Sequence, residues 1–302
     1  MTEAAAPPCV NCGAQSSRQI LQKGSDKRRY QVSLRRCESC GLVFQSEWQT
    51  NCTFEIYEYF DSASWKDGNL SLNKITEGRY LDLLSRFATL TKGRCLLDIG
   101  CGAGWFVTTA GNHGWQAEGI DAAHGAVDYC EQFGRNVRKA DIYDVEGQYD
   151  VCTMFEVIEH VPNPEAFLKQ AISLVRPGGL LYVTTPNFDS FDRRVLGADW
   201  NSIHIEHLSY FGAGQLKDLL AGLGLSVVAM TTHNLSMASL SKLLRGRRPA
   251  GGSDVGHADG VARETIEASP PLRLAKSIAN AALNVTRLGN ATTVLCRKPA
   301  LS

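Results

Sequence analysis

The chain has 302 residues, of which 44% are hydrophobic and 21% charged, values that are ordinary for a soluble protein long enough to bury a substantial core. Its 31 basic and 31 acidic residues balance, so no overall field draws it to nucleic acid or to an anionic membrane. The first residues lack a basic segment followed by an apolar stretch, and no run reaches the roughly 18 apolar residues that span a bilayer, so we expect a cytoplasmic protein.

Two C-x-x-C turns, Cys9-x-x-Cys12 and Cys37-x-x-Cys40, open the chain. The segment between them is typical of a hairpin with a Gly-Ser-Asp turn. Four converging thiolates are the tetrahedral ligands of a structural zinc ion, and they leave no position open for water. Two unrelated pairs, or a redox motif, are the alternatives. The redox hypothesis is the weaker one, because neither pair lies at the strand-to-helix junction of a thioredoxin-like unit. The remaining cysteines are scattered, which fits a reducing compartment. We therefore expect a zinc ribbon.

A second, larger domain follows the ribbon. Residues 54–65 are rich in aromatics and are expected to bridge the ribbon and the larger domain, and residues 75–90 show helical periodicity. From residue 94 the pattern alternates strands and helices, which is typical of a parallel α/β sheet. We expect the ribbon and bridge within residues 1–60 and the α/β domain within residues 61–302.

A glycine-rich turn follows the first strand of that domain in "RCLLDIGCGAGWF". Gly100, Gly102 and Gly104 let the backbone approach a ligand closely and aim a helix N-terminus at it. The G-x-G-x-G spacing is one residue tighter than the dinucleotide fingerprint. Asp98 opens the turn, and we count it among the candidate cofactor-binding residues.

Acidic residues end the next two strands. Asp121 ends "WQAEGID", where a carboxylate can accept hydrogen bonds from both ribose hydroxyls. Asp141 and Ile142 end the third strand, where they can bracket an adenine ring. Asp121 as a simple helix cap is the alternative. The three sites together are far more specific than a glycine motif alone.

These residues, with "YDVCTMFEVIEHVPNP", "RPGGLLYVTTPN" and "HIEHLSYF", resemble the class I S-adenosylmethionine-dependent methyltransferases over about residues 75–235. The similarity is greatest to the branch that includes the ubiquinone-biosynthesis O-methyltransferases and methyltransferases of polysaccharide and natural-product pathways. The resemblance implies a glycine turn that contacts the methionine part of the cofactor, an acid for the ribose, and an acid with its neighbour for the adenine. In that order these roles fall to Gly100, Gly102 and Gly104, to Asp121, and to Asp141 and Ile142.

The resemblance also implies a seven-stranded sheet in the order 3-2-1-4-5-7-6, with the last strand antiparallel. We expect its turn into the fifth strand at 177–179, and a helix over 213–224 that ends at Gly222 or Gly224. The expected strands are 94–99, 116–120, 136–140, 150–155, 180–185, 225–231 and 291–297.

The stretch "FEVIEHVPNP" places Glu156, Glu159 and His160 at the end of the fourth strand, where this fold receives the methyl acceptor. Three hypotheses remain open. Glu156 holds the amino end of the cofactor while the other two residues only begin a short helix. Alternatively, His160 is the general base for an acceptor hydroxyl. In the third, all three residues share one helical face and bind Mg²⁺ or Mn²⁺, as the resemblance to ubiquinone and small-RNA O-methyltransferases implies.

Two further histidines, His204 and His207, lie in "HIEHLSYF" on a loop that closes over the acceptor pocket in this fold. Either one is a candidate second base or fourth metal ligand. Tyr210 and Phe211 are expected to be packing residues at the start of a helix.

Residues 234–290 are unusual for the domain. Leu274, Ile278, Ala282 and Val285 form a helical stripe, with Arg273, Lys276 and Arg287 away from it. The stripe predicts a helix packed on its own domain. The alternative is a lid or a membrane-surface helix that makes peripheral membrane contact and suits a lipid-linked substrate.

The sequence therefore predicts a zinc-ribbon-bearing, S-adenosylmethionine-dependent methyltransferase that acts on a hydroxyl of a small molecule or glycan. Sugar C-methylation is an alternative. An RNA methyltransferase using the ribbon and residues 27–29 is a second, although the zero net charge argues against it. A non-catalytic binding module is a third. The acceptor and the oligomeric state are not predicted.

Overall fold

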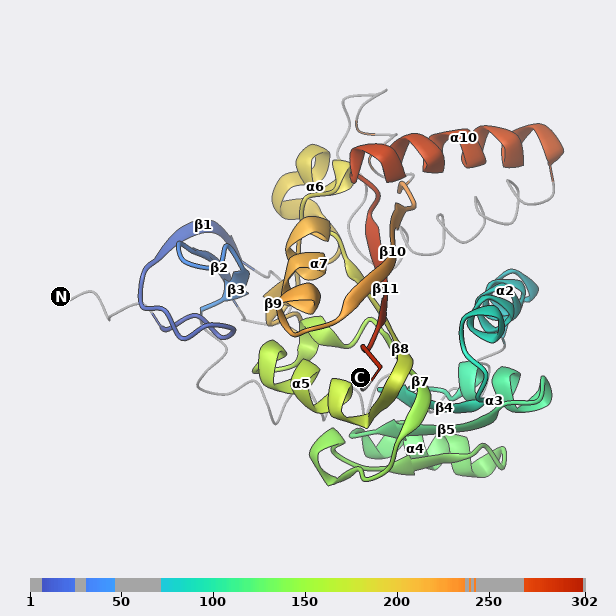
Figure 1. The fold of residues 1–302 in the computed structure, drawn as a ribbon. Coiled ribbons are helices and arrows are strands. Elements are labelled where there is room, and N and C mark those ends of the chain that lie inside the picture. Colours follow the sequence, from blue (N-terminus) through green and yellow to red (C-terminus); the bar gives the residue numbers. More distant parts are fainter. Residues whose placement is uncertain are drawn as a thin grey trace.

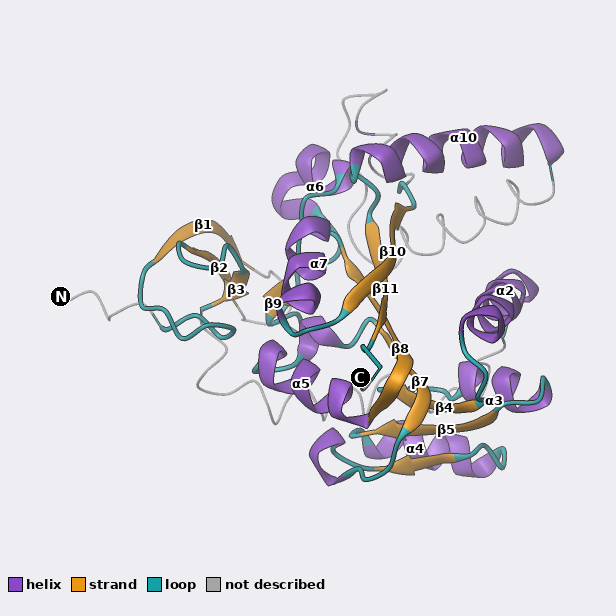
Figure 2. Cartoon of the chain, in the orientation of Figure 1, coloured by secondary structure: helices purple, strands orange, loops and turns teal. Residues whose placement is uncertain are grey.

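The computed structural model describes residues 7–24, 31–46, 72–236, 239, 242 and 269–300. They form a large sheet flanked by helices and a small sheet beside it (Figures 1 and 2). Two predicted features lie outside the described residues, namely the hairpin turn with the basic residues 27–29 and the aromatic bridge 54–65, and so does much of the stretch 234–290.

The large sheet, within the described chain, has seven strands in the order β10-β11-β8-β7-β4-β5-β6. β11 is antiparallel to both of its neighbours, and the remaining pairs are parallel. This is the predicted order counted from the opposite edge, so the predicted α/β topology is confirmed. The strands span Cys95–Ile99 (β4), Gln116–Asp121 (β5), Val137–Lys139 (β6), Tyr149–Phe155 (β7), Val175–Pro186 (β8), Ser226–His233 (β10) and Ala291–Arg297 (β11).

β8 begins earlier than predicted. Its first residue is Val175, so the expected turn at 177–179 lies inside the strand as an irregularity, where the register with β7 shifts. Gly178 adopts a φ of 78°, and its N–H donates to the carbonyl of Lys298. The residue after β11 thus accepts a hydrogen bond from the backbone of the turn, and residues 177–179 remain part of the sheet.

The helices cover both faces of the sheet because neighbouring residues of a strand point to opposite sides. Leu96 packs with side chains of α2 and α3, whereas Leu97 packs in the core that α5 and α7 cover. The predicted helices over 75–90 and 213–224 are α2 and α7. The helices span Lys74–Leu90 (α2), Trp105–Asn112 (α3), His124–Gln132 (α4), Pro164–Leu174 (α5), Phe191–Leu196 (α6), Ala213–Gly222 (α7) and Pro270–Thr286 (α10), with 3-10 turns at Ile142–Asp144 (η2), Ile158–His160 (η3) and Gly197–Asp199 (η4).

The small sheet joins the N-terminal segment to the large domain. β1 and β2 form the predicted antiparallel hairpin, β3 pairs with β2, and β9 of the large domain pairs with β3. Phe44 packs in the α5–α7 core, while its neighbour Val43 packs with Phe188 and Trp200 on the other side. The N-terminal sheet therefore packs against the large domain through both faces of β3. Its strands span Ser17–Gly24 (β1), Gln31–Cys37 (β2), Val43–Gln45 (β3) and Ser209–Tyr210 (β9).

Helix α10 differs from its prediction. Leu274, Ile278 and Val285 are 64%, 63% and 84% exposed, so the expected packing of this stripe on the domain is wrong for these side chains. Asn280 and Asn284 instead accept hydrogen bonds from backbone N–H groups of β10 and the residue after it. The face of α10 that carries the asparagines thus accepts hydrogen bonds from the edge strand of the sheet, and the apolar side chains lie on the exposed side.

No helix in the described part of the chain is long and apolar enough to cross a membrane.

Candidate active site

The glycine turn between β4 and α3 requires glycine for two reasons. Gly100, Gly102 and Gly104 have φ values of 68°, 50° and 67°, in the left-handed region that side chains disfavour. At Gly100 a Cβ atom would also lie 2.6 Å from Cγ2 of Val157. Gly100 and Gly102 line the cavity described below, whereas Gly104 precedes α3 as its N-cap outside that lining.

Asp98 lies beneath the turn and does not line the cavity. Its side chain is 2% exposed, and Thr153 donates a hydrogen bond of 2.6 Å to it. Burial raises the pKa of Asp98 to about 7. Its position indicates a role in holding β4 against β7 below the turn.

The two acidic strand ends face the same cavity. Asp121 accepts hydrogen bonds of 2.9 Å from the backbone N–H groups of Gly102 and Ala123, which fixes its carboxylate beside the turn. Asp141 caps η2 by accepting from the Tyr143 N–H. The sheet brings these residues together because parallel strands end at one edge.

A cavity of about 530 Å³ runs along this edge of the sheet. Part of its wall is apolar and comes from Phe155, Val161, Phe167 and Leu208. Predicted site residues that line it are Gly100, Gly102, Asp121, Asp141, Ile142, Glu156 and His160.

Glu156 follows the last residue of β7 and lines the cavity. It has a φ of 56°, a strained conformation for a side-chain-bearing residue, and such strain gathers at functional sites. Thr184 of β8 holds it: its hydroxyl lies 3.3 Å from the Glu156 carboxyl, and its carbonyl accepts from the Glu156 N–H. Burial raises the pKa of Glu156 to about 7.

Glu159 lies behind the cavity wall and is 1% exposed. Oε2 accepts a hydrogen bond of 2.9 Å from the Thr185 hydroxyl, while Oε1 is buried without a hydrogen bond to the described residues. Burial, and next the nearby Glu156 charge, raise the pKa of Glu159 well above its usual range.

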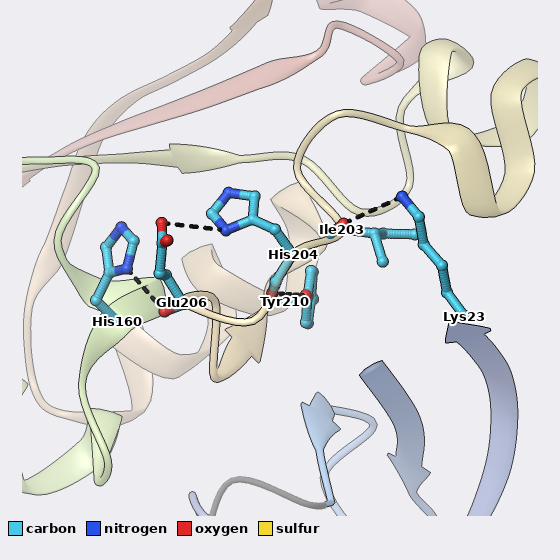
Figure 3. A network of polar contacts seen from close by, with 6 residues as sticks. All are labelled: Lys23, His160, Ile203, His204, Glu206 and Tyr210. Carbon is cyan, nitrogen blue, oxygen red and sulfur yellow. Dashed lines mark hydrogen bonds and ion pairs between the residues drawn. The ribbon is translucent and has the colours of Figure 1, made fainter. Parts of the chain in front are cut away.

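His160 lies on the cavity wall, and its Nδ1 is 2.8 Å from the carbonyl oxygen of Glu206 (Figure 3). A carbonyl oxygen only accepts, so Nδ1 carries the proton and Nε2 has the lone pair. Burial lowers the pKa of His160, which keeps the ring neutral near pH 7.

The other two predicted histidines, His204 and His207, lie next to His160. The His207 ring centroid is 4.7 Å from that of His160 and 3.9 Å from that of His204. His207 is 6% exposed, and its Nδ1 is buried without a hydrogen bond to the described residues. Burial and the neighbouring His204 lower its pKa well below the usual range. His204 Nδ1 lies 3.5 Å from the Glu206 carboxylate (Figure 3).

Glu159, His160 and His207 place one ligand atom each within 4.8 Å of one another. This group differs from the predicted metal-binding set of Glu156, Glu159 and His160, because His207 belongs to it and Glu156 does not. The reason is local: residues 158–160 form a single 3-10 turn, and the strained Glu156 precedes it. The four predicted acceptor-side residues, Glu159, His160, His204 and His207, do lie together.

The four N-terminal cysteines also converge. Their Sγ atoms all lie within 4.8 Å, with Cys9 3.6 Å from Cys40 and Cys12 3.6 Å from Cys37. Each turn closes in the same way, since Gly13 N–H donates to the Cys9 carbonyl and Gly41 N–H to the Cys37 carbonyl. A tetrahedral thiolate site with Zn–S bonds of about 2.3 Å fits this spacing.

A family model described as a methyltransferase domain matches residues 72–230, just over half of the 302 residues. The chain belongs to this methyltransferase family. The match covers the cavity and stops short of the four cysteines, so it bears on the cofactor and acceptor residues and not on the ribbon.

This methyltransferase is similar to ubiquinone biosynthesis O-methyltransferases. It is 31% identical to that of Coxiella burnetii (strain RSA 493 / Nine Mile phase I) over 120 residues, which cover 36% of this chain and 51% of the relative. It is 29% identical to that of Shewanella halifaxensis (strain HAW-EB4) over 132 residues, which cover 40% and 56%. The chain thus spans about half the length of the curated relatives that it matches.

Solved structures share the fold at low identity. A magnesium protoporphyrin IX methyltransferase from Synechocystis PCC 6803 with bound SAH aligns with a TM-score of 0.51 at 13% identity, over 81% of this chain and 99% of that chain. A SAM-dependent methyltransferase from Archaeoglobus fulgidus aligns with a TM-score of 0.50 at 18% identity, over 82% and 100%. The fold is that of the class I S-adenosylmethionine-dependent methyltransferases.

Sequence reasoning missed two parts of the site. The apolar wall of Phe155 and Phe167 is one, although Phe155 ends a predicted strand and could have been assigned to the cavity. The other is the pairing of β9 with β3, which connects His207 to the N-terminal sheet. Two-residue strands that pair over such a sequence separation carry no periodic signal.

Proposed function

We propose that this methyltransferase transfers the methyl group of S-adenosylmethionine to a hydroxyl of a small molecule or glycan, with His160 as the general base. The observation that carries the proposal is the orientation of His160 on the cavity wall. Its Nδ1–H is engaged by the Glu206 carbonyl, which leaves the Nε2 lone pair as the proton acceptor. A neutral, buried imidazole beside the expected sulfonium suits proton removal near pH 7.

We assign the cofactor to the glycine-turn half of the cavity. The backbone of Gly100 and Gly102 would contact its methionine part, Asp121 its ribose hydroxyls, and Asp141 with Ile142 its adenine. Support for this assignment comes from the common cavity that these residues line, in which Gly100 and Gly102 present backbone without a side chain.

Transfer is then a single in-line displacement. The acceptor oxygen attacks the methyl carbon, the carbon–sulfur bond breaks, and the hydroxyl proton passes to His160 Nε2, leaving S-adenosylhomocysteine. The apolar walls keep water from the reacting atoms, and the fixed imidazole supplies proximity and orientation. The relatives' printed name, O-methyltransferase, favours oxygen as the acceptor atom.

A divalent metal at Glu159, His160 and His207 is the second form of this proposal. The residues fit a metal, because Glu159 Oε1 and His207 Nδ1 are buried without hydrogen bonds to the described residues. A bound ion would lower the pKa of the acceptor hydroxyl. Two imidazoles and one carboxylate suit Mn²⁺ or Zn²⁺ better than Mg²⁺, which prefers oxygen ligands. The four-cysteine site would hold a separate, structural zinc ion.

Calorimetric titration of S-adenosylhomocysteine into metal-stripped and manganese- or magnesium-loaded protein tests both forms, with zinc content measured alongside. Binding in the stripped sample and no uptake of added metal would support His160 as the base. A second metal that is lost in Glu159→Ala or His207→Ala would support the metal-bound form. Absence of binding in every sample would overturn the enzyme proposal and leave a non-catalytic module.

The acceptor is sought with isotopically labelled S-adenosylmethionine and a panel of phenols, sugars and sugar derivatives. A mass-spectrometric shift on oxygen is expected. Methylation on carbon would overturn the O-methyl assignment and favour a sugar C-methyltransferase.

A further inference from the structure

Two guanidinium groups approach one aromatic ring where the small sheet meets α6. Arg36 of β2 has its Cζ 5.8 Å from the Phe188 ring centroid, and Arg193 of α6 has its Cζ 4.8 Å from the same centroid. Phe188 is 7% exposed, so this ring is a fixed platform between the N-terminal sheet and the methyltransferase domain. Two cations thus gather from sequence positions that are far apart.

These cations lack an acidic partner in the described structure. No ion pair of the described residues includes Arg36 or Arg193. The Arg36 guanidinium donates to the Gly41 carbonyl, and Arg193 Nε is buried without any partner among the described residues. Burial, and next the charge of Arg36, lower the pKa of Arg193.

Asp192, the sequence neighbour of Arg193, accepts from the Ser236 N–H, and the two side chains share no ion pair in the described structure. Half-buried like charges are costly unless an anion offsets them. The two positive charges are therefore arranged as in a binding site for an anionic ligand.

The Phe188 ring beneath the two guanidiniums packs against the histidine loop. The Phe188 ring centroid is 5.7 Å from that of Tyr210, which is 6.0 Å from that of His207. The Tyr210 hydroxyl donates to the carbonyl of His204. These ring contacts connect Phe188 to the histidines of the acceptor side, although Phe188 and the two arginines are not themselves lining residues of the cavity.

We propose that Arg36 and Arg193 bind a phosphate group, and that the methyl acceptor is a phosphorylated compound of the sugar-phosphate or nucleoside-diphosphate-sugar class. The inference of an acceptor rests on the proposed function. A planar guanidinium can donate two parallel hydrogen bonds to two phosphate oxygens. Stacking on an aromatic ring orients the guanidinium before the phosphate binds. Arginine therefore suits this position better than lysine.

The test is calorimetric titration of inorganic pyrophosphate and of UDP-glucose, at constant ionic strength, into the full-length protein saturated with S-adenosylhomocysteine. Arg193→Gln and Arg36→Gln are compared with Arg194→Gln, which removes the same charge from the exposed neighbouring residue of α6. We expect each of the first two variants to weaken binding by about tenfold or more, because charge-assisted hydrogen bonds are lost. Arg194→Gln should bind as the unchanged protein does.

Several outcomes would overturn the proposal. One is failure of the unchanged protein to bind either probe, and another is an equal loss in Arg194→Gln, which would indicate a diffuse surface charge. Pyrophosphate bound as tightly as UDP-glucose would indicate a site for free phosphate and contradict the acceptor assignment. Glucose alone should bind far more weakly than UDP-glucose.

The affinity for S-adenosylhomocysteine and the zinc content, measured on each variant, separate this proposal from the proposed function. If S-adenosylhomocysteine binds normally and the phosphate probes do not, the methyltransferase proposal stands and the phosphate site is wrong. Arg193→Gln keeps the test valid should Arg36→Gln disturb the zinc ribbon, because Arg193 lies outside the small sheet.

Discussion

The two halves of the cavity are built in different ways. The cofactor half comes from consecutive parallel strands, and each of its residues lies within or directly after one short motif. The acceptor half comes from η3, from the loop that carries His204 and His207, and from the N-terminal sheet that pairs with this loop. Local sequence fixes the first half, whereas contacts between distant segments fix the second. Substitutions should therefore separate cofactor binding from methyl transfer.

The largest expected effect is on His160, which lies in the acceptor half. His160→Gln should lower the rate of methyl transfer by about 10²–10⁴-fold, because the general base is lost. The affinity for S-adenosylhomocysteine should not change. The rate is measured as S-adenosylhomocysteine formation with an acceptor found in the panel. His124→Gln is the matched control, since His124 is exposed and its described ion pair is with Asp128 on the same helix. Equal losses in the two variants would contradict the base assignment.

The next effect tests the cofactor half. Asp121→Asn should weaken binding of S-adenosylhomocysteine by about 10- to 100-fold, because a charged hydrogen-bond acceptor for ribose and for the Gly102 N–H is removed. Calorimetric titration measures it. Asp128→Asn, an exposed carboxylate on α4, should bind normally. An unchanged affinity in Asp121→Asn would place the ribose elsewhere.

Loss of the zinc ligands should act mainly on the acceptor half. Cys40→Ser should abolish zinc binding and loosen β3, whose partner β9 holds the histidine loop. Hydrogen exchange of residues 203–210 should therefore speed up more than that of residues 95–142. Cys95→Ser, outside the cluster, serves as the control. Faster exchange throughout the domain would instead mean that the ribbon supports the whole fold.

Glu159→Gln tests whether the buried carboxyl is protonated or holds a metal. A carboxyl whose folded-state pKa lies above its usual 4.5 binds its proton more tightly in the folded protein, so unfolding becomes easier as pH rises above 4.5. In metal-free protein the variant should hence be more stable, and its advantage should grow with pH. Thermal unfolding should show a gain of about 2–4 °C for each kcal/mol. A loss of stability in metal-free protein would contradict a protonated Glu159, whereas a loss seen only after manganese is added would indicate a metal that needs the carboxylate.

The smallest effect is expected at Lys23, which reaches from β1 to the histidine loop and donates to the Ile203 carbonyl at 3.3 Å (Figure 3). Lys23→Met should lower the free energy of unfolding by about 0.5–1.5 kcal/mol through loss of this hydrogen bond. Urea unfolding measures the change. Arg18→Met, an exposed cation of the same strand, should have no effect. Similar losses in both variants would point to charge and not to the contact.

The same division explains what the sequence could predict. The glycine turn, Asp121 and Asp141 were recognisable because each lies at or just beyond the end of a strand that the sequence pattern marks. The role of Asp98 was less visible, since nothing local shows that Thr153 of another strand bonds to it. The metal set was only partly predicted, because His207 reaches Glu159 through the fold and not through helical spacing. The stripe of α10 has the right period, but the asparagine face holds the helix.

The shared small sheet also determines where the chain can be cut. Phe188, Leu196, Trp200, Ile203 and Tyr210 are buried with Val32, Leu34 and Val43 of the N-terminal strands. A shortened protein that begins near residue 72, where the family match starts, would expose this apolar surface and leave β9 with an open edge. Such a fragment would associate with copies of itself, so the smallest soluble unit of this enzyme includes its cysteine-bearing N-terminus.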